Sequence, residues 1–169
     1  MSRSIGPDLP LDLFHSLSQV DLSHHLGKVL PLVTVDPDGF PHPMLLSYLE
    51  VRAIDPRTIR IVIGARSRSS RNLLDRQVAS LLIIEPDRTV YVKAKATDGP
   101  YPVEGLPDFG LFVLAVGDVL EDAPQEWESG VGIAAGPIYA PIPSLDDPRI
   151  RATLDGLRGE QHMGTYPGP

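Results

Sequence analysis

Residues 61–84 read IVIGARSRSSRNLLDRQVASLLII and place a cluster of hydroxyl and arginine side chains between two apolar segments. Residues 59–63 are rich in β-branched side chains and precede Gly64, and residues 78–84 are continuously apolar, so both segments are predicted to be strands. Residues 72–76 between them have room for little more than two helical turns, with the preceding serines as N-caps. Hydroxyls and free backbone N–H groups at a helix N-terminus, flanked by guanidinium groups, are suited to binding a phosphate monoester.

Turn residues divide the sequence on either side of this segment into further strands. The run Asp36-Pro37-Asp38-Gly39 fits a type I turn, with proline at the second position and glycine at the fourth. Residues 98–108 are rich in proline and glycine and are predicted to form a loop. The six predicted strands span residues 29–35, 43–54, 59–63, 78–84, 89–96 and 109–120.

Helical patterns lie on both sides of the strands. The predicted flanking helices span residues 8–26, 123–135 and 146–157. Gly27 is expected to stop the first helix, and Asp146 or Asp147 is expected to cap the last one. The residues after Gly159 are expected to be disordered.

Six strands at hairpin spacings, with one short helix between the third and fourth, predict a mainly β fold of the α+β type: a small six-stranded antiparallel barrel with flanking N- and C-terminal helices. The chain is expected to be a single domain. An N-terminal helical segment would cover residues 1–27, the barrel residues 28–121, and a helical cover with a flexible tail residues 122–169.

Composition excludes several classes of function. The chain has 169 residues, no cysteine and a formal net charge of −7. Thiolate catalysis, disulfides and cysteine-ligated metals are therefore excluded, and a general affinity for nucleic acid is not expected. Residues 1–14 contain no apolar signal region and no later window resembles a membrane span, so we expect a cytoplasmic protein without membrane contact. An arginine cluster on an acidic protein favours a small anionic ligand. We expect no metal site, because the histidines lack the i, i+4 spacing of a helical zinc site.

Three segments together resemble a known family. Residues 67–73 read SRSSRNL and are followed by VASLL at residues 78–82. Residues 88–96 read RTVYVKAKA, and residues 41–46 read PHPMLL. These words, in this order, resemble the FMN-binding split barrel typified by pyridoxamine 5'-phosphate oxidase, over about residues 28–121. In that family a Ser-Arg-Lys-x-x-x-Leu segment holds the FMN phosphate, and Ser67 and Arg68 match its first two positions.

The resemblance implies a homodimer with FMN at the subunit interface and a small-molecule redox substrate, hence an FMN-dependent oxidoreductase. No catalytic residue and no substrate is assigned. The implied cofactor-binding residues are Pro43, Met44, Leu45, Leu46, Ile63, Gly64, Ala65, Arg66, Ser67, Arg68, Ser69, Ser70, Asn72 and Lys95. Simpler interpretations exist for three of these groups: a solvated loop at residues 66–72, a core strand at residues 43–46, and a soluble strand edge at Lys95.

The departures from the family leave alternatives open. Ser69 stands where the family has a phosphate-binding lysine, and Thr89 where it has a glutamine near the flavin. Pro43 and Tyr48 replace two further charged residues. Oxidation of pyridoxamine phosphate itself is therefore not expected. A cofactor-free ligand-binding or structural barrel is one alternative, and a barrel that uses deazaflavin F420 or haem is another.

Overall fold

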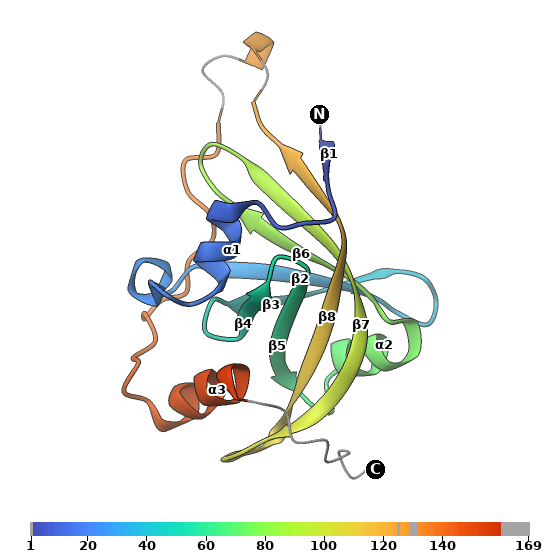
Figure 1. Ribbon diagram of the computed structural model, residues 1–169, viewed down its shortest axis with the longest axis vertical. Coiled ribbons are helices and arrows are strands. Elements are labelled where there is room, and N and C mark those ends of the chain that lie inside the picture. Colours follow the sequence, from blue (N-terminus) through green and yellow to red (C-terminus); the bar gives the residue numbers. More distant parts are fainter. Residues whose placement is uncertain (1, 125, 129–131, 160–169) are drawn as a thin grey trace.

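The computed structural model describes residues 2–124, 126–128 and 132–159. These residues form one antiparallel sheet of eight strands with three α-helices packed against it (Figure 1). The strands are β1 (Arg3–Gly6), β2 (Val29–Val35), β3 (Pro41–Ser47), β4 (Val51–Asp55), β5 (Thr58–Gly64), β6 (Val78–Ile84), β7 (Thr89–Val103) and β8 (Leu106–Asp122). The helices are α1 (Leu11–Leu17), α2 (Arg68–Arg76) and α3 (Pro148–Arg158), with 3-10 turns η1 (Leu22–His25) and η2 (Glu126–Glu128). None of the described helices is long and apolar enough to cross a membrane.

The order of the strands forces the sheet to curl. Hydrogen-bonded neighbours run β3-β2-β6-β7-β8-β5-β4, with β1 paired to β8. β3 and β4 are thus the two edges of this series, although only residues 48–50 connect them. A flat sheet of seven strands would hold its edges about 29 Å apart, whereas four Cα steps span at most about 14 Å. The edges must therefore bend towards each other, and Figure 1 shows β3 and β4 brought together.

The prediction of one long strand over residues 43–54 is wrong, because the chain turns between β3 and β4. Glu50 donates its backbone N–H to the Ser47 carbonyl at 3.0 Å, and Ser47 donates its own N–H to the Glu50 carboxylate at 2.8 Å. The Glu50 carbonyl in turn accepts from the backbone N–H of Val62 on β5, at 2.9 Å. The turn is thus closed on itself and attached to the neighbouring strand.

Gln19 holds the same turn from the N-terminal segment. Its amide Nε2 donates to the carbonyl oxygens of Tyr48 at 2.9 Å and Val51 at 3.1 Å, and its side chain is buried. Its backbone has a φ of 65°, in the left-handed region. A residue 29 positions away from Tyr48 therefore supplies partners for backbone groups that the turn itself leaves unpaired.

The predicted loop over residues 98–108 is also wrong for most of its length. β7 continues to Val103 and β8 begins at Leu106, so only Glu104 and Gly105 form the turn. Gly105 has a φ of +76°, which favours glycine. Gly99 and Pro100 fall where the β7–β8 register shifts, between the pairs Asp98–Val113 and Tyr101–Leu111, and such irregularities are where strands accommodate these residues.

Other expectations differ in detail. The count of six strands is not confirmed, because β1 was missed and residues 43–54 divide into two strands. The helix expected over residues 8–26 is only α1 followed by η1. Of the helix expected over residues 123–135, the described residues show only η2, and residues 125 and 129–131 lie outside the described part, as does the tail after Gly159. The last helix is confirmed as α3.

Two apolar clusters fill the interior. The larger lies inside the curled sheet and includes the fully buried Leu32, Leu81 and Val92 from its central strands. The smaller lies on the outer face of the sheet, where Leu157 of α3 packs against Val62 of β5. Helix α3 contributes to both clusters, because its Leu154 belongs to the larger one.

We expect Gln19→Ala to lower the free energy of unfolding by about 2 kcal/mol, because it leaves two buried carbonyl groups without partners. Gln77→Ala is the matched control, since Gln77 has a similar φ of 60° but is exposed. The control should change stability by less than about 0.5 kcal/mol. Urea unfolding measures both, and equal losses would show that backbone conformation, and not the Gln19 hydrogen bonds, is responsible.

Candidate anion site at the start of α2

The turn that leads from β5 into α2 confirms the predicted serine cap. Ser67 accepts a hydrogen bond on its hydroxyl from the backbone N–H of Ser70 at 3.1 Å, and its own N–H donates to the Gly64 carbonyl at 3.0 Å. The helix then begins at Arg68. The N–H groups of Arg68 and Ser69, in the first turn, have no intrahelical acceptor; Arg68 is exposed, whereas Ser69 is buried.

The next polar side chains of α2 point inward and hold the helix in place. The Ser70 hydroxyl donates to the Gly64 carbonyl at 2.9 Å. Asn72 donates through Nδ2 to the Thr34 hydroxyl at 3.0 Å and to the Asp36 carboxylate at 2.9 Å. Ser69, Ser70 and Asn72 are all buried as whole residues, so their side chains serve the packing of α2 and present little surface to a ligand.

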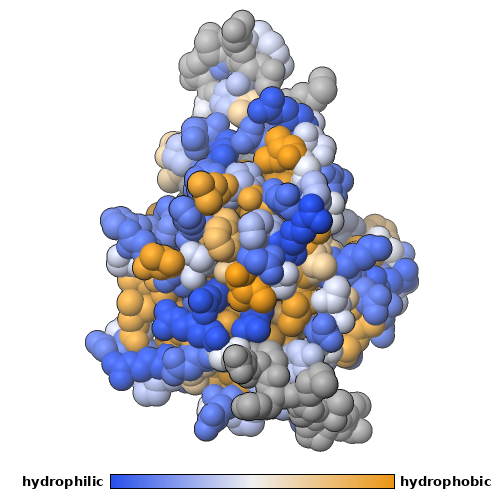
Figure 2. Space-filling model, viewed as in Figure 1, coloured by the Kyte–Doolittle hydropathy of each residue, from blue (hydrophilic) through white to orange (hydrophobic). Residues whose placement is uncertain are grey.

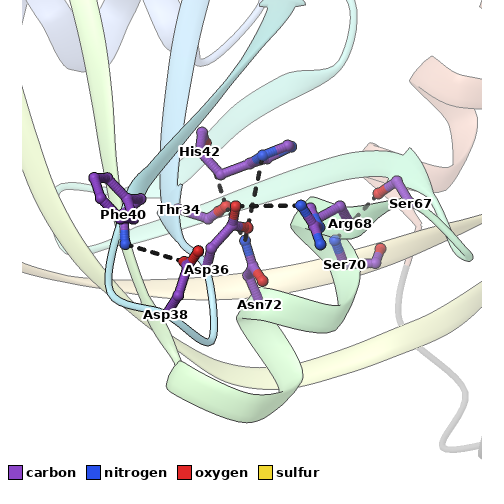
Figure 3. A network of polar contacts seen from close by, with 9 residues as sticks. All are labelled: Thr34, Asp36, Asp38, Phe40, His42, Ser67, Arg68, Ser70 and Asn72. Atoms are coloured by element: carbon purple, nitrogen blue, oxygen red, sulfur yellow. Dashed lines mark hydrogen bonds and ion pairs between the residues drawn. The ribbon is translucent and has the colours of Figure 1, made fainter.

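Asp36 is the centre of the polar network in Figure 3. Besides Asn72, its carboxylate has Arg68 Nη1 at 3.4 Å and His42 Nδ1 at 3.6 Å. Arg76 at the far end of α2 donates to the carbonyl of Pro37 in the adjoining turn. The network thus ties α2 to the β2–β3 hairpin by contacts at both ends of the helix.

Sequence reasoning missed Asp36, Thr34 and His42 as members of this site. Asp36 was assigned only to a turn, and that turn is confirmed by the hydrogen bond from Gly39 N–H to the Asp36 carbonyl at 2.9 Å. The contacts with Arg68 and Asn72 span 32 and 36 positions. No local pattern carries such information, because the pairing depends on how the two segments meet in the folded sheet.

The exposed surface of the site is basic. Arg66 and Arg71 are exposed, and the Arg68 side chain is 59% exposed even though it reaches Asp36. All three residues lie in the turn before α2 or in its first turn, at the helix end that carries a partial positive charge. The arrangement fits a phosphate group, which would take backbone N–H donors, the Ser67 hydroxyl and one or two guanidinium groups. The Asp36 carboxylate disfavours anion binding here, because a bound anion would have to share Arg68 with it.

The remaining predicted residues divide between this site and other places. Ile63 is buried, and Gly64 and Ala65 lead into the Ser67 cap. On β3 the side chains alternate: Leu46 is buried and Met44 half-buried, whereas Pro43 and Leu45 face outward. Met44 shares the face of His42, two residues from the Asp36 network.

Lys95 lies away from the cluster within one subunit. It pairs with Val78, and the neighbouring Ala96 N–H donates to the carbonyl of Gln77, which follows the C-terminus of α2. A nine-residue helix is about 14 Å long, so Lys95 and the Ser67 cap lie at opposite ends of it. Lys95 instead lines an open groove of about 640 Å³ on the outer face of β2, β6, β7 and β8.

A second cavity lies near the turn between β3 and β4. It measures about 460 Å³ and lies between Glu50, Phe109 and the segment that leads into α3. Glu50 accepts hydrogen bonds on Oε2 from the Ser47 N–H and hydroxyl at 2.8 and 2.9 Å. Burial raises the pKa of Glu50, and the two Ser47 bonds offset only part of that effect.

No group of three potential metal ligands occurs among the described residues.

Glu50 should make the protein less stable as pH rises. Because its pKa in the folded state is raised above its ordinary value of 4.5, the folded protein holds the Glu50 proton to higher pH than the unfolded chain does. The contribution of Glu50 to the free energy of unfolding therefore falls as pH rises from about 4.5 through the folded pKa.

We expect Glu50→Gln to be more stable than the wild type at neutral pH, with the difference disappearing below pH 4.5. The glutamine oxygen can still accept both hydrogen bonds from Ser47. Urea unfolding across this pH range tests the expectation, with the exposed Glu104→Gln as control. A constant difference between wild type and Glu50→Gln at all pH values would contradict it.

Comparison with known proteins identifies the fold. No family model and no curated protein matches the sequence. Among solved structures, a pyridoxamine 5'-phosphate oxidase-like protein from Lactobacillus delbrueckii superposes with a TM-score of 0.51 at 17% identity, covering 69% of this chain and 98% of its own. An FMN-binding protein from Syntrophomonas wolfei gives 0.50 at 13% identity, with 68% and 89% covered. The HupZ protein of Group A Streptococcus gives 0.51 at 10% identity, with 78% and 98% covered.

Structural similarity at sequence identities this low establishes the fold but does not identify the ligand. The resemblance noted in the sequence is confirmed at that level, since neighbours of the pyridoxamine 5'-phosphate oxidase and FMN-binding types share the architecture. The chain therefore has a mainly antiparallel fold of the split-barrel kind, with eight strands in a sheet that curls without closing.

Proposed function

We propose that this protein is an FMN-binding flavoprotein whose cofactor phosphate binds at the start of α2. The observation that carries the proposal is the Ser67-capped helix N-terminus with the exposed guanidinium groups of Arg66 and Arg68 beside it. The fold is shared with an FMN-binding protein, which supports a flavin in preference to an unrelated phosphate ester.

The chain's own residues would divide the cofactor between them. Backbone N–H groups at the start of α2 and the guanidinium groups of Arg66 and Arg68 would hold the phosphate. The backbones of residues 43–46 and 63–65 would supply donors and acceptors to the polar edge of the ring. Bound FMN would supply hydride acceptance and electron transfer, so the protein would act as an oxidoreductase.

Asp36 and Asn72 would orient the phosphate site without touching the ligand. Asn72 Nδ2 donates a hydrogen bond to the Asp36 carboxylate at 2.9 Å, and the other oxygen of that carboxylate lies 3.4 Å from Arg68 Nη1. A guanidinium has five donors, so Arg68 can contact Asp36 along one edge and a phosphate along another. The same ion pair also supports the main alternative, a barrel without cofactor in which Arg68 serves only to attach α2 to the β2–β3 hairpin.

We further propose that two copies associate through the outer face of β3, β2, β6 and β7. That face exposes Leu45 at 56% and contains the apolar groove lined by Val33, Val35 and Val78. Apolar area of this kind on a sheet face is typical of a contact surface. Within one subunit Lys95 is too far from the Ser67 cap to share a ligand, so it would contact cofactor only across such an interface.

The phosphate assignment is tested by comparing FMN with riboflavin, which lacks the phosphate. Arg68→Ala should weaken FMN binding about tenfold, the value of one charge-assisted contact, and leave riboflavin binding unchanged. Lys95→Ala should affect FMN less than Arg68→Ala does. Fluorescence titration gives both affinities, and a larger effect of Lys95→Ala would show that the phosphate binds elsewhere.

The visible spectrum of the purified protein separates the alternatives. A colourless protein that does not bind added FMN would favour the cofactor-free alternative, and an absorption band at about 400 nm would indicate haem.

The dimer is tested by placing a charge on the proposed contact face. Leu45→Glu should convert a dimer into a monomer, because the carboxylate would be buried without a partner in the interface. Leu11→Glu is the control, since Leu11 is 70% exposed and lies on α1, away from that face. Size exclusion with light scattering measures the mass, and a wild-type protein that is already monomeric at high concentration would refute the interface.

A further inference from the structure

Three arginines meet on the outer face of the sheet, away from the start of α2. Arg52 of β4 and Arg60 of β5 are direct partners in the antiparallel pairing. Val51, Ala53, Ile59 and Ile61 beside them point into the core, so the two arginines point outward. Arg158 lies in the last turn of α3, which packs on the same strands. In Figure 2 strongly hydrophilic side chains gather over the region where β4, β5 and α3 meet.

Arg60 has hydrogen-bond partners in α3 and at its end, but no such bond is seen for Arg52 in the described part of the chain. Arg60 Nη1 donates to the carbonyl oxygens of Leu157 at 3.1 Å and Gly159 at 2.7 Å, which satisfies carbonyl groups at the helix end. Among the described residues, no acidic side chain forms an ion pair with Arg52, Arg60 or Arg158. Three like charges are thus held together by packing and by one helix end.

This arrangement costs free energy in the isolated protein. Like charges directly opposite each other on neighbouring strands are destabilising. The Nε groups of Arg52 and Arg60 are buried and have no hydrogen-bond partner among the described residues. Burial, together with the charges of Arg158 and Arg60, lowers the pKa of Arg52. Among the described residues only the Gln19 amide oxygen shares this condition, so the two arginines are held at a cost that the rest of the fold largely avoids.

Chain composition makes the absence of a counter-charge notable. The protein has 22 acidic and 15 basic side chains, so carboxylates are in excess. Other arginines use them: Arg57 pairs with Asp8, and Arg88 contacts Asp12, Glu85 and Glu121. Among the described residues the Arg52 cluster receives none, and fixed guanidinium forks are suited to a planar or tetrahedral oxyanion.

We propose that Arg52, Arg60 and Arg158 form a second anion site, which binds the phosphate or sulfate group of a small ligand. The site is separate from the start of α2: Arg60 and Gly64 are four residues apart on β5, about 13 Å, and Figure 1 shows α2 and α3 on opposite sides of that strand. A bound oxyanion neutralises the opposed charges and accepts from the terminal guanidinium nitrogens, since the Nε groups are buried. The proposal does not depend on flavin binding.

Thermal unfolding in phosphate and in chloride at equal ionic strength tests the site. In chloride, Arg52→Gln should be at least as stable as the wild type, because it removes a repelling charge. Phosphate at about ten times its dissociation constant should raise the wild-type Tm by about 4 °C more than that of Arg52→Gln. Arg68→Gln, which alters the α2 site, should keep this Arg52-dependent gain. An equal rise in Tm for wild type and Arg52→Gln would show that phosphate stabilises the protein by a general salt effect, and this would refute the site.

NMR of the arginine Nε–H groups locates the anion directly. The signals that disappear in Arg52→Gln and Arg60→Gln should shift and saturate as inorganic phosphate is added to the wild type. Unchanged signals would overturn the proposal. Glu160→Gln tests whether a carboxylate of the chain itself, and not a free anion, neutralises the arginines. If the signals respond to phosphate only in this variant, Glu160 is the partner, and the proposal is likewise overturned.

Discussion

The three-residue connection between β3 and β4 is the constraint on which the rest of the fold depends. It joins the two edges of a seven-strand series that would otherwise lie far apart, so the sheet must curl around its apolar face. Burial of residues such as Leu32 and Leu81 supplies the driving force, but burial has no direction. The backbone bonds of the connection, with the Gln19 amide, decide which edges meet.

The candidate anion site lies where α2 packs against the β2–β3 hairpin. α2 leaves β5 and leads into β6, which pairs with β2, and its Asn72 and Arg68 reach Asp36 at the end of β2. The polar network thus fastens the helix to the hairpin and fixes the helix N-terminus. A phosphate bound there would meet donors that the fold has already positioned, so little ordering entropy opposes binding.

Local signals predicted the parts of this structure that are locally determined. The Ser67 cap, the turn at Asp36–Gly39 and the capped α3 all follow from neighbouring residues, and all are present. The turn at residues 48–50 was missed because its sequence, Tyr-Leu-Glu, contains no glycine or proline and its partner, Gln19, is remote. The strand over residues 98–103 was missed for the opposite reason: its prolines and glycines signal a loop, and pairing with β8 overrides them. Asp36 and His42 could not be placed in the site, because the pairing of β2 with β6, which follows α2, brings them to the helix, and no local pattern predicts that pairing.

The two arginine clusters differ in how the fold balances their charge, and this difference bears on what each can bind. At the start of α2 a carboxylate already faces Arg68, so an incoming anion gains only the part of the guanidinium that Asp36 leaves open, and backbone N–H groups must supply the remainder. That favours a ligand with other attachments, such as a ring held along β3. Where β4, β5 and α3 meet, no described carboxylate pairs with Arg52, so at the second proposed site charge neutralisation itself would provide the gain and a small free oxyanion would suffice. The two proposals thus differ in the anion that each site would favour, and the difference follows from how each arginine cluster is balanced.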